Sequence, residues 1–288
     1  MKHIIKLMRP HQYVKNLFIL APLFFVGQVT NYALLLESIQ AFVAFSICAS
    51  GVYVLNDWLD IEADKTHPKK KFRPLASGAV SRPAALGIML VCFISGGALM
   101  LAVSIESLVI LSTYVLLNIG YSFYLKHIAI LDVAIISVGF VLRLFVGSAA
   151  TGVLLSKWIV IMTFLLALFM ALAKRRDDVL IFLNTGAKMR RSVDGYNLAL
   201  IDASMTIMTA VVIVSYILYT TSAEVVQRLQ NEYLYVTTLF VILGVLRYLQ
   251  ITYVEENSGS PTKIAIKDNF IRCSILAWLC SYAWIIYI

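Results

Sequence analysis

Three aspartates near the end of an apolar run have a spacing that could bind a divalent cation. Asp57, Asp60 and Asp64 stand at positions i, i+3 and i+7. On a helix these positions fall within about 60° of one another. Three carboxylates on one face repel one another unless a cation lies between them. Mg²⁺ suits such oxygen ligands and usually takes one or two carboxylates together with phosphate oxygens.

The spacing therefore predicts a Mg²⁺ ion that bridges this helix to a diphosphate. Asn56 adds an amide that could coordinate or orient a carboxylate, whereas Glu62 points to the other side of the helix. A solvated helix end with scattered acids is the competing interpretation. A calcium EF-hand loop is excluded, because its alternating ligands and its glycine are missing.

Two basic segments could hold phosphate groups. The first follows the aspartates and contains Lys69, Lys70, Lys71 and Arg73. Lys holds phosphate by charge, and Arg can form two parallel hydrogen bonds with it. The second begins with Lys174-Arg175-Arg176-Asp177-Asp178 and later carries Lys188, Arg190, Arg191 and Tyr196. This much positive charge predicts substrates that carry several phosphates. Contact with anionic lipid headgroups is the alternative for both segments.

Composition shows what must position these residues. The 288-residue chain is 60% hydrophobic and only 14% charged, against about 25% charged in soluble proteins. Too few charges are available to cover a soluble surface, so the solvent is lipid. The net charge of +8 does not indicate nucleic acid, because the basic residues lie in short loops between apolar runs.

Apolar runs of about 20 residues, the length needed to cross a membrane, predict an all-α fold with nine transmembrane helices. The expected spans are 17–36, 39–57, 83–104, 107–125, 129–150, 156–174, 197–220, 232–250 and 269–287. No long polar linker separates them, so residues 1–288 are expected to form one integral-membrane catalytic domain. Loops near 58–82 and 175–196 are its longest polar segments.

The distribution of charge predicts the orientation. With a cytosolic N-terminus, most of the 24 Lys and Arg residues fall on the cytosolic side, as the positive-inside rule requires. Both long loops are then cytosolic and the C-terminus lies outside. Asp132 and Arg143 fall within the fifth span, about three turns apart, so they cannot pair directly. Charge within a span marks function by default. Asp132 could reach a cytosolic site, while Arg143 could equally serve structure by binding a helix carbonyl.

The aspartate motif resembles that of the UbiA superfamily of membrane prenyltransferases. Asn56, Asp57, Asp60 and Asp64 match its Asn-Asp-x-x-Asp-x-x-x-Asp pattern in full. The superfamily has nine helices, and its prenyl-diphosphate enzymes carry a second aspartate-rich motif after the sixth. This chain has Lys174–Asp178 there instead.

The sequence is most similar to one branch, the decaprenyl-phosphate phosphoribosyltransferases. Residues 9–16 resemble that branch's Arg-Pro-x-Gln-Trp-x-Lys-Asn, with Tyr13 in place of Trp. Residues 67–74 resemble His-Pro-x-Lys-Arg-x-Arg-Pro, and Leu142-Arg143 lies in a similar fifth helix. Lys174-Arg175 with Asp178 resembles Lys-Arg-x-x-Glu, and Arg190 with Tyr196 resembles the segment that follows.

The resemblance implies a Mg²⁺-dependent glycosyltransferase of the cytosolic face of a bacterial-type inner membrane. It would move 5-phosphoribose from phosphoribosyl diphosphate to a decaprenyl-type phosphate and release diphosphate, in cell wall biosynthesis. Asn56, Asp57, Asp60 and Asp64 would be catalytic, the three aspartates as metal ligands. The implied substrate-binding residues are Lys15, Asn16, Lys70, Lys71, Arg73, Lys174, Arg175, Asp178, Arg190, Arg191 and Tyr196. A homo-oligomer is compatible with the sequence, and nucleic acid is not an expected partner.

Two alternatives stay open. A UbiA-type prenyltransferase would move a prenyl group from its diphosphate to an aromatic or other small acceptor, but it should have the second aspartate motif. A membrane transporter should have charges near the middle of the bilayer and broken helices, whereas this chain concentrates charge at one face.

Overall fold

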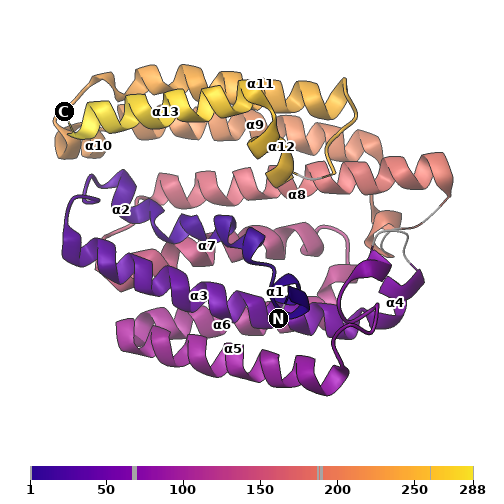
Figure 1. Cartoon of the computed structure of the whole chain (residues 1–288). Coiled ribbons are helices and arrows are strands. Elements are labelled where there is room, and N and C mark those ends of the chain that lie inside the picture. Colours follow the sequence, from indigo (N-terminus) through magenta and orange to yellow (C-terminus); the bar gives the residue numbers. More distant parts are fainter. Residues whose placement is uncertain (1, 67–69, 187, 189–190, 260, 288) are drawn as a thin grey trace. The chain divides into compact units, whose positions relative to one another are not determined.

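The structure is a computed structural model that describes residues 2–66, 70–186, 188, 191–259 and 261–287 (Figure 1). Over this part of the chain the backbone forms helices and turns without a strand, which confirms the all-α prediction. Eight of its helices are long and apolar enough to cross a membrane. The chain divides into two compact units, Met1–Lys126 with Gly139–Leu155, and His127–Val138 with Ser156–Ile288. That the chain forms a single catalytic domain stays a prediction.

The first unit is built around one long buried helix, α3. Its elements are α1 (Lys2–Met8), η1 (Pro10–Ile19), α2 (Ala21–Phe25), α3 (Tyr32–Leu59), α4 (Ile61–Thr66), η2 (Lys70–Phe72), α5 (Arg82–Val103), α6 (Ile105–Phe123) and the second half of α7 (Leu131–Thr151). Helix α3 lies beside α5 and α6 (Figure 1). Small residues on its buried face, such as Ala44 and Ala49, permit close approach between helices.

The first expected span, 17–36, is wrong as a single helix. A ten-residue 3₁₀ helix, η1, is followed by the five-residue helix α2, and the long helix begins only at Tyr32. Pro10 is the first residue of η1, Pro22 is the second residue of α2, and Gly27 turns the chain with φ 77°. Proline favours the first turn of a helix and interrupts its interior. The second expected span is therefore extended toward the N-terminus in α3.

The long 3₁₀ helix is explained by the residues that its repeat places on one side. With three residues per turn, Tyr13, Asn16 and Ile19 fall on the same face. The Tyr13 hydroxyl lies 2.8 Å from Ser50 Oγ, and Asn16 Nδ2 donates to Ser46 Oγ at 2.9 Å. As the residue number increases along η1, the residue number of its partner in α3 decreases. The two elements therefore run antiparallel.

Gly147 lets α7 approach η1 within the first unit. A Cβ atom at this position would overlap the Ile19 carbonyl. The same contact brings the Phe18 and Phe140 rings to a centroid distance of 5.3 Å in an edge-on arrangement. The backbone contact at Gly147 thus fixes the position of η1, and with it the polar side chains that η1 carries.

We predict that Gly147→Ala destabilises the protein by about 1–3 kcal/mol, because a methyl group cannot fit without moving backbone. Thermal unfolding in detergent should show a melting temperature several degrees lower. Gly97→Ala is the matched control, because a Cβ at Gly97 would meet no atom within 4 Å. Equal melting temperatures for the two variants would show that the close approach does not constrain the fold.

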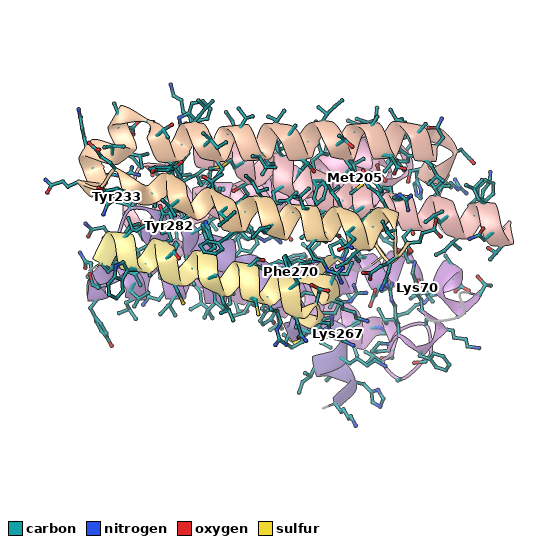
Figure 2. The ribbon with its side chains drawn as sticks, turned by 90° about the horizontal axis from the view of Figure 1, so that it is seen from above. Lys70, Met205, Tyr233, Lys267, Phe270 and Tyr282 are labelled. Carbon is teal, nitrogen blue, oxygen red and sulfur yellow. The ribbon has the colours of Figure 1, made fainter. Side chains whose placement is uncertain are left out.

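The second unit is a helical bundle. Its elements are the first half of α7, α8 (Lys157–Thr185), η4 (Arg191–Gly195), α9 (Leu198–Thr221), α10 (Ala223–Leu229), η5 (Tyr233–Thr237), α11 (Thr238–Tyr253), α12 (Pro261–Lys267) and α13 (Asn269–Tyr287), with η3 (Leu125–His127) at the boundary. Helix α8 packs on α9, and α11 packs on α13. Phe270 and Tyr282 lie toward opposite ends of α13 (Figure 2).

The other expected spans coincide with helices, and the main difference is the end of the sixth. Helix α8 continues beyond the expected end at residue 174 to Thr185. It ends at Gly186, whose φ of 69° is left-handed, a conformation that favours glycine. Lys174–Asp178 therefore lie on a helix. The loop expected at 175–196 is helical over its first half, and the loop expected at 58–82 contains α4 and η2.

Candidate functional site

The predicted metal-binding aspartates lie where α3 ends and α4 begins. The Asp60 amide still donates to the Asn56 carbonyl at 3.0 Å, and the Asp64 amide donates to the Asp60 carbonyl at 2.8 Å. The helical path thus continues through a break at Asp60, and positions i and i+7 stay on one face. Asp57 and Asp64 are each only 2% exposed. Buried carboxylates require compensating charge or hydrogen bonds.

A single guanidinium group joins the two buried aspartates. Arg73 Nη1 lies 3.0 Å from Asp57 Oδ1 and 2.7 Å from Asp64 Oδ2. Arg9 Nη2 makes a second ion pair with Asp57 Oδ1, and its guanidinium lies 5.3 Å from the centre of the Tyr53 ring. Two aspartates and two arginines of the first unit therefore form a nearly neutral cluster.

Asp60 points away from this cluster. Its Oδ1 lies 2.7 Å from Lys126 Nζ, which follows the end of α6. The Asn56 side chain accepts a hydrogen bond from Ser122 Oγ at 2.6 Å. Asn56 therefore attaches α3 to α6, and Asp60 attaches the end of α3 to η3. Glu62 is exposed on the other side and pairs with Lys65 and Arg82, as expected from its position.

The donor set of Asp57 and Asp64 fits a magnesium ion. Arg73 Nη1 lies between their carboxylate oxygens, so a cation there would have two carboxylate ligands, the number Mg²⁺ commonly takes alongside water and phosphate. Among the residues that the structure describes, no three His, Cys, Asp or Glu side chains are grouped around one point. Asp60 could join such a site only by leaving Lys126.

A second charged cluster lies inside the second unit. Arg175 is 1% exposed, and its Nε lies 2.7 Å from Asp132 Oδ2. Its Nη1 binds Asp178, one helical turn further along α8. Tyr196 donates to Asp132 Oδ1 at 2.6 Å, and Ser192 donates to Oδ2 at 3.0 Å. Asp132 thus connects the start of α7 to α8 and to the segment before α9.

Burial, and after it the hydrogen bond to Asp132, raises the pKa of Tyr196 well above its usual value. The phenol therefore stays protonated and remains a donor. It also accepts from the Ile130 amide at 2.7 Å. Because Arg175, Asp178 and Tyr196 are bound to one another or to Asp132, their observed contacts serve to hold this unit together.

The remaining predicted substrate-binding residues differ in exposure. Lys71, Lys174 and Arg191 are exposed, and Lys15 and Lys70 are half-buried. Asn16 is buried and bonds to Ser46 and Arg143. Arg190 lies outside the described residues, as do His67, Pro68 and Lys69 of the first basic segment.

Sequence reasoning did not identify Arg9 and Lys126 as partners of the aspartates, nor Asp202 as the partner of Arg176. Arg9 and Lys126 bind the aspartates of the first unit, and Arg176 of the second unit pairs with Asp202 at 2.8 Å. Arg9 is the first residue of the Arg-Pro motif, and Lys126 is the only Lys or Arg in the sequence between α6 and α7. The sequence alone could therefore have indicated both residues. The partner of Arg176 is 26 positions away in the sequence, and no local pattern predicts it.

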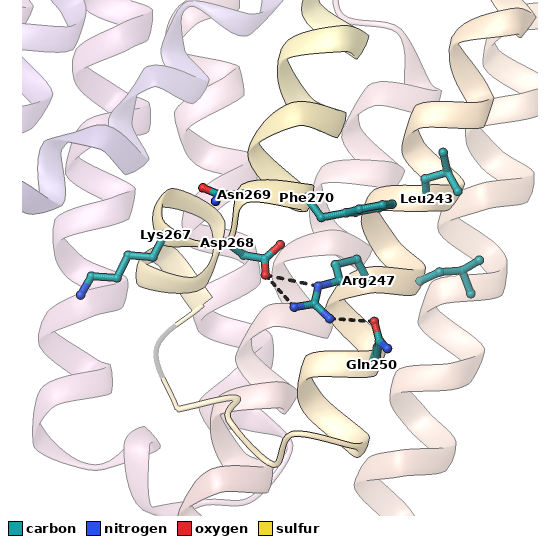
Figure 3. Close-up of a pocket in the computed structure, with 8 residues that line it drawn as sticks. Leu243, Arg247, Gln250, Lys267, Asp268, Asn269 and Phe270 are labelled. Atoms are coloured by element: carbon teal, nitrogen blue, oxygen red, sulfur yellow. Dashed lines mark hydrogen bonds and ion pairs between the residues drawn. The ribbon is translucent and has the colours of Figure 1, made fainter.

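A surface pocket of about 710 Å³ lies elsewhere in the second unit, between α11 and the start of α13 (Figure 3). Its charged residue Arg247 binds Asp268 at 2.8 Å and Gln250 Oε1 at 2.7 Å. A further ion pair joins Arg247 to Glu255 at 2.9 Å. The pocket contains no predicted site residue and its arginine is already neutralised, so we do not assign the chemistry to it.

We predict that Tyr196→Phe lowers the free energy of unfolding by about 1.5–3 kcal/mol, since it removes a donor to the buried charged Asp132. Thermal unfolding of the purified protein measures this loss. Tyr235→Phe is the control, because Tyr235 is 50% exposed and its hydroxyl should contribute little. An unchanged melting temperature for Tyr196→Phe would contradict the role assigned to this hydrogen bond.

Comparison with known proteins places these features in context. Residues 17–271 match the UbiA prenyltransferase family. A decaprenyl-phosphate phosphoribosyltransferase of Corynebacterium glutamicum is 31% identical over 288 residues, covering 99% of this chain and 86% of that protein. The Mycolicibacterium smegmatis enzyme of the same name is 32% identical over 286 residues, covering 96% of this chain and 90% of that protein.

Solved structures show the same fold. The structure of a UbiA homolog from Archaeoglobus fulgidus bound to GPP and Mg²⁺ matches with a TM-score of 0.75, covering 99% of this chain and 100% of that one. Sequence identity is 18%, so this likeness concerns the fold alone.

Proposed function

The chain belongs to the UbiA prenyltransferase family, and from this premise we propose that it transfers 5-phosphoribose from phosphoribosyl diphosphate to a polyprenyl phosphate. It is a multi-pass membrane protein and an enzyme of the transferase class. Its similarity to decaprenyl-phosphate phosphoribosyltransferases extends over nearly the whole chain. We further propose a bacterial inner membrane, with the N-terminus and the aspartate motif on the cytosolic side.

One observation carries the choice of donor. The segment that corresponds to the second aspartate motif of prenyl-diphosphate enzymes contains Arg175, which is buried between Asp132 and Asp178. The Arg175 side chain is 1% exposed, whereas the Arg73 side chain is 27% exposed. A metal ion could therefore displace Arg73 from its aspartates, but it would have to remove a fully buried arginine to reach Asp132 and Asp178. This supports a donor whose diphosphate requires one acidic cluster rather than two, and it disfavours a prenyl diphosphate.

The proposed reaction is substitution at the anomeric carbon of the ribose. An oxygen of the lipid phosphate forms a bond to C1 while the bond from C1 to the diphosphate oxygen breaks, and the diphosphate leaves with the electron pair. The attacking phosphate is already an anion, so no strong general base is needed. Positioning and charge stabilisation should therefore supply most of the rate enhancement.

The first-unit cluster suits the leaving group. Mg²⁺ held by Asp57 and Asp64, with Asp60 as a third ligand, would neutralise negative charge on the departing diphosphate. Arg73 and Arg9 are the cations in contact with these aspartates, and they would bind diphosphate oxygens through charge-assisted hydrogen bonds. Lys70, Lys71, Lys174, Arg190 and Arg191 stay predictions as further phosphate contacts.

The direct test is a transfer assay. Purified protein in detergent is incubated with Mg²⁺, phosphoribosyl diphosphate and decaprenyl phosphate, and the lipid fraction is analysed by mass spectrometry. We expect a phosphoribosylated lipid and released diphosphate, both abolished by a chelator. No product under these conditions, together with transfer from a prenyl diphosphate to a small acceptor, would overturn the proposal.

We predict that Asp57→Asn and Asp64→Asn each lower kcat/KM roughly 100-fold or more, because a preorganised charge at the leaving group is lost. The same assay measures the loss, and size-exclusion profiles report folding. Glu62→Gln serves as the control, since its carboxylate is exposed and pairs with Lys65 and Arg82. Activity of either aspartate variant within twofold of wild type would contradict the metal assignment.

A further inference from the structure

Arg143 in the first unit is a buried cation held by neutral groups. It is 5% exposed. Its Nε donates to Asn16 Oδ1 at 2.8 Å, Nη1 donates to the Gly139 carbonyl at 2.6 Å, and Nη2 donates to the Tyr114 hydroxyl at 3.2 Å. Within the described part of the chain, Arg143 has no carboxylate partner. Buried charges are normally paired, so this arginine is fixed in place without being neutralised.

Aromatic rings surround the same guanidinium group. Its carbon lies 5.0 Å from the centres of the Phe45 and Tyr114 rings, and 5.2 Å from the centre of the Phe140 ring. Such cation–π contacts stabilise a cation but supply no negative charge. The rings and the neutral acceptors therefore orient Arg143 and leave its charge available.

Lys15 places a second cation close by. It precedes Asn16, the residue that binds Arg143, and it has no hydrogen-bond or ion-pair partner among the described residues. Burial, and after it the positive charges of Arg143 and Arg9, lower the pKa of Lys15 to about 8. Two adjacent half-buried or buried cations repel each other, and a bound anion would remove that repulsion.

We propose that Lys15 and Arg143 bind the phosphate monoester of the acceptor lipid. This assignment rests on the proposed function. A phosphate monoester carries up to two negative charges and several acceptor oxygens, which suit one ammonium and one guanidinium group. Phe140, the one of the three rings beside Arg143 that is only half-buried, offers an apolar contact to the start of a prenyl chain.

The level at which Lys15 and Arg143 lie beside α3 favours the lipid phosphate over the soluble donor as their ligand. Tyr13 and Asn16, on either side of Lys15, contact Ser50 and Ser46 of α3. These serines precede Asp57 by seven and eleven residues, which is about 10–16 Å along a helix. The pair thus lies deeper along a membrane-spanning helix than the aspartates, where a lipid headgroup drawn inward would reach it.

The 5-phosphate of the donor is also a phosphate monoester, so the experiment must distinguish binding of the donor from binding of the lipid phosphate. Lys15→Met removes the charge and keeps the length of the side chain. We expect the KM for decaprenyl phosphate to rise roughly tenfold or more, with the KM for phosphoribosyl diphosphate within twofold of wild type. Lys15→Arg should restore most of the loss, and Lys157→Met, at an exposed residue of the second unit, should change neither constant.

A binding measurement makes the inference independent of turnover. Native mass spectrometry compares decaprenyl phosphate with unphosphorylated decaprenol on protein without donor. Wild type should prefer the phosphate, and Lys15→Met should lose that preference. Arg143→Lys, which retains a cation, should bind lipid phosphate more weakly but still fold.

If wild type shows this preference but forms no phosphoribosylated lipid, the proposed function fails while the lipid-phosphate subsite stands. A rise confined to the KM for phosphoribosyl diphosphate would overturn the lipid assignment. Equal phosphate preference in wild type and Lys15→Met would overturn the subsite itself.

Discussion

The sharing of Arg73 between Asp57 and Asp64 is the interaction on which the first unit depends. Two carboxylates this deeply buried could not both stay ionised without a cation between them. The guanidinium group fixes the distance between the carboxylates and connects the segment after α4 to the end of α3. We propose that the guanidinium group thereby holds the two carboxylates at a spacing that suits a shared cation. A metal ion would replace an existing positive charge rather than enter an uncompensated acidic cluster.

The second unit also buries two aspartates, but it holds them with one arginine where the first unit has two. There one buried arginine, Arg175, satisfies two aspartates, and Tyr196 adds a neutral donor to Asp132. Breaking such a buried pair is costly because it leaves an uncompensated charge. The cluster is therefore well suited to hold α7, α8 and η4 in one arrangement. Arg143 differs from both cases, since among the described residues it is held by neutral groups and aromatic rings.

Sequence patterns predicted the helices and the aspartate motif, because hydrophobic runs and i, i+3, i+7 spacing are local properties. The family resemblance drawn from Asn56 to Asp64 is confirmed. The first span was wrong, since the 3₁₀ geometry of η1 depends on hydrogen bonds from Tyr13 and Asn16 to a distant helix. The sequence also could not predict that Asp60 points away from Asp57 and Asp64, because Asp60 is held by Lys126, a partner 66 residues away.

We propose that the cluster of Asp57, Asp64 and Arg73 binds the diphosphate of a phosphoribosyl donor together with Mg²⁺. Isothermal titration calorimetry of the purified protein tests it most directly, with phosphoribosyl diphosphate and geranyl diphosphate as ligands. We expect phosphoribosyl diphosphate to bind only with Mg²⁺ present and at least tenfold more tightly than geranyl diphosphate. Tighter binding of geranyl diphosphate, or binding of the phosphoribosyl donor that is unchanged without Mg²⁺, would contradict it.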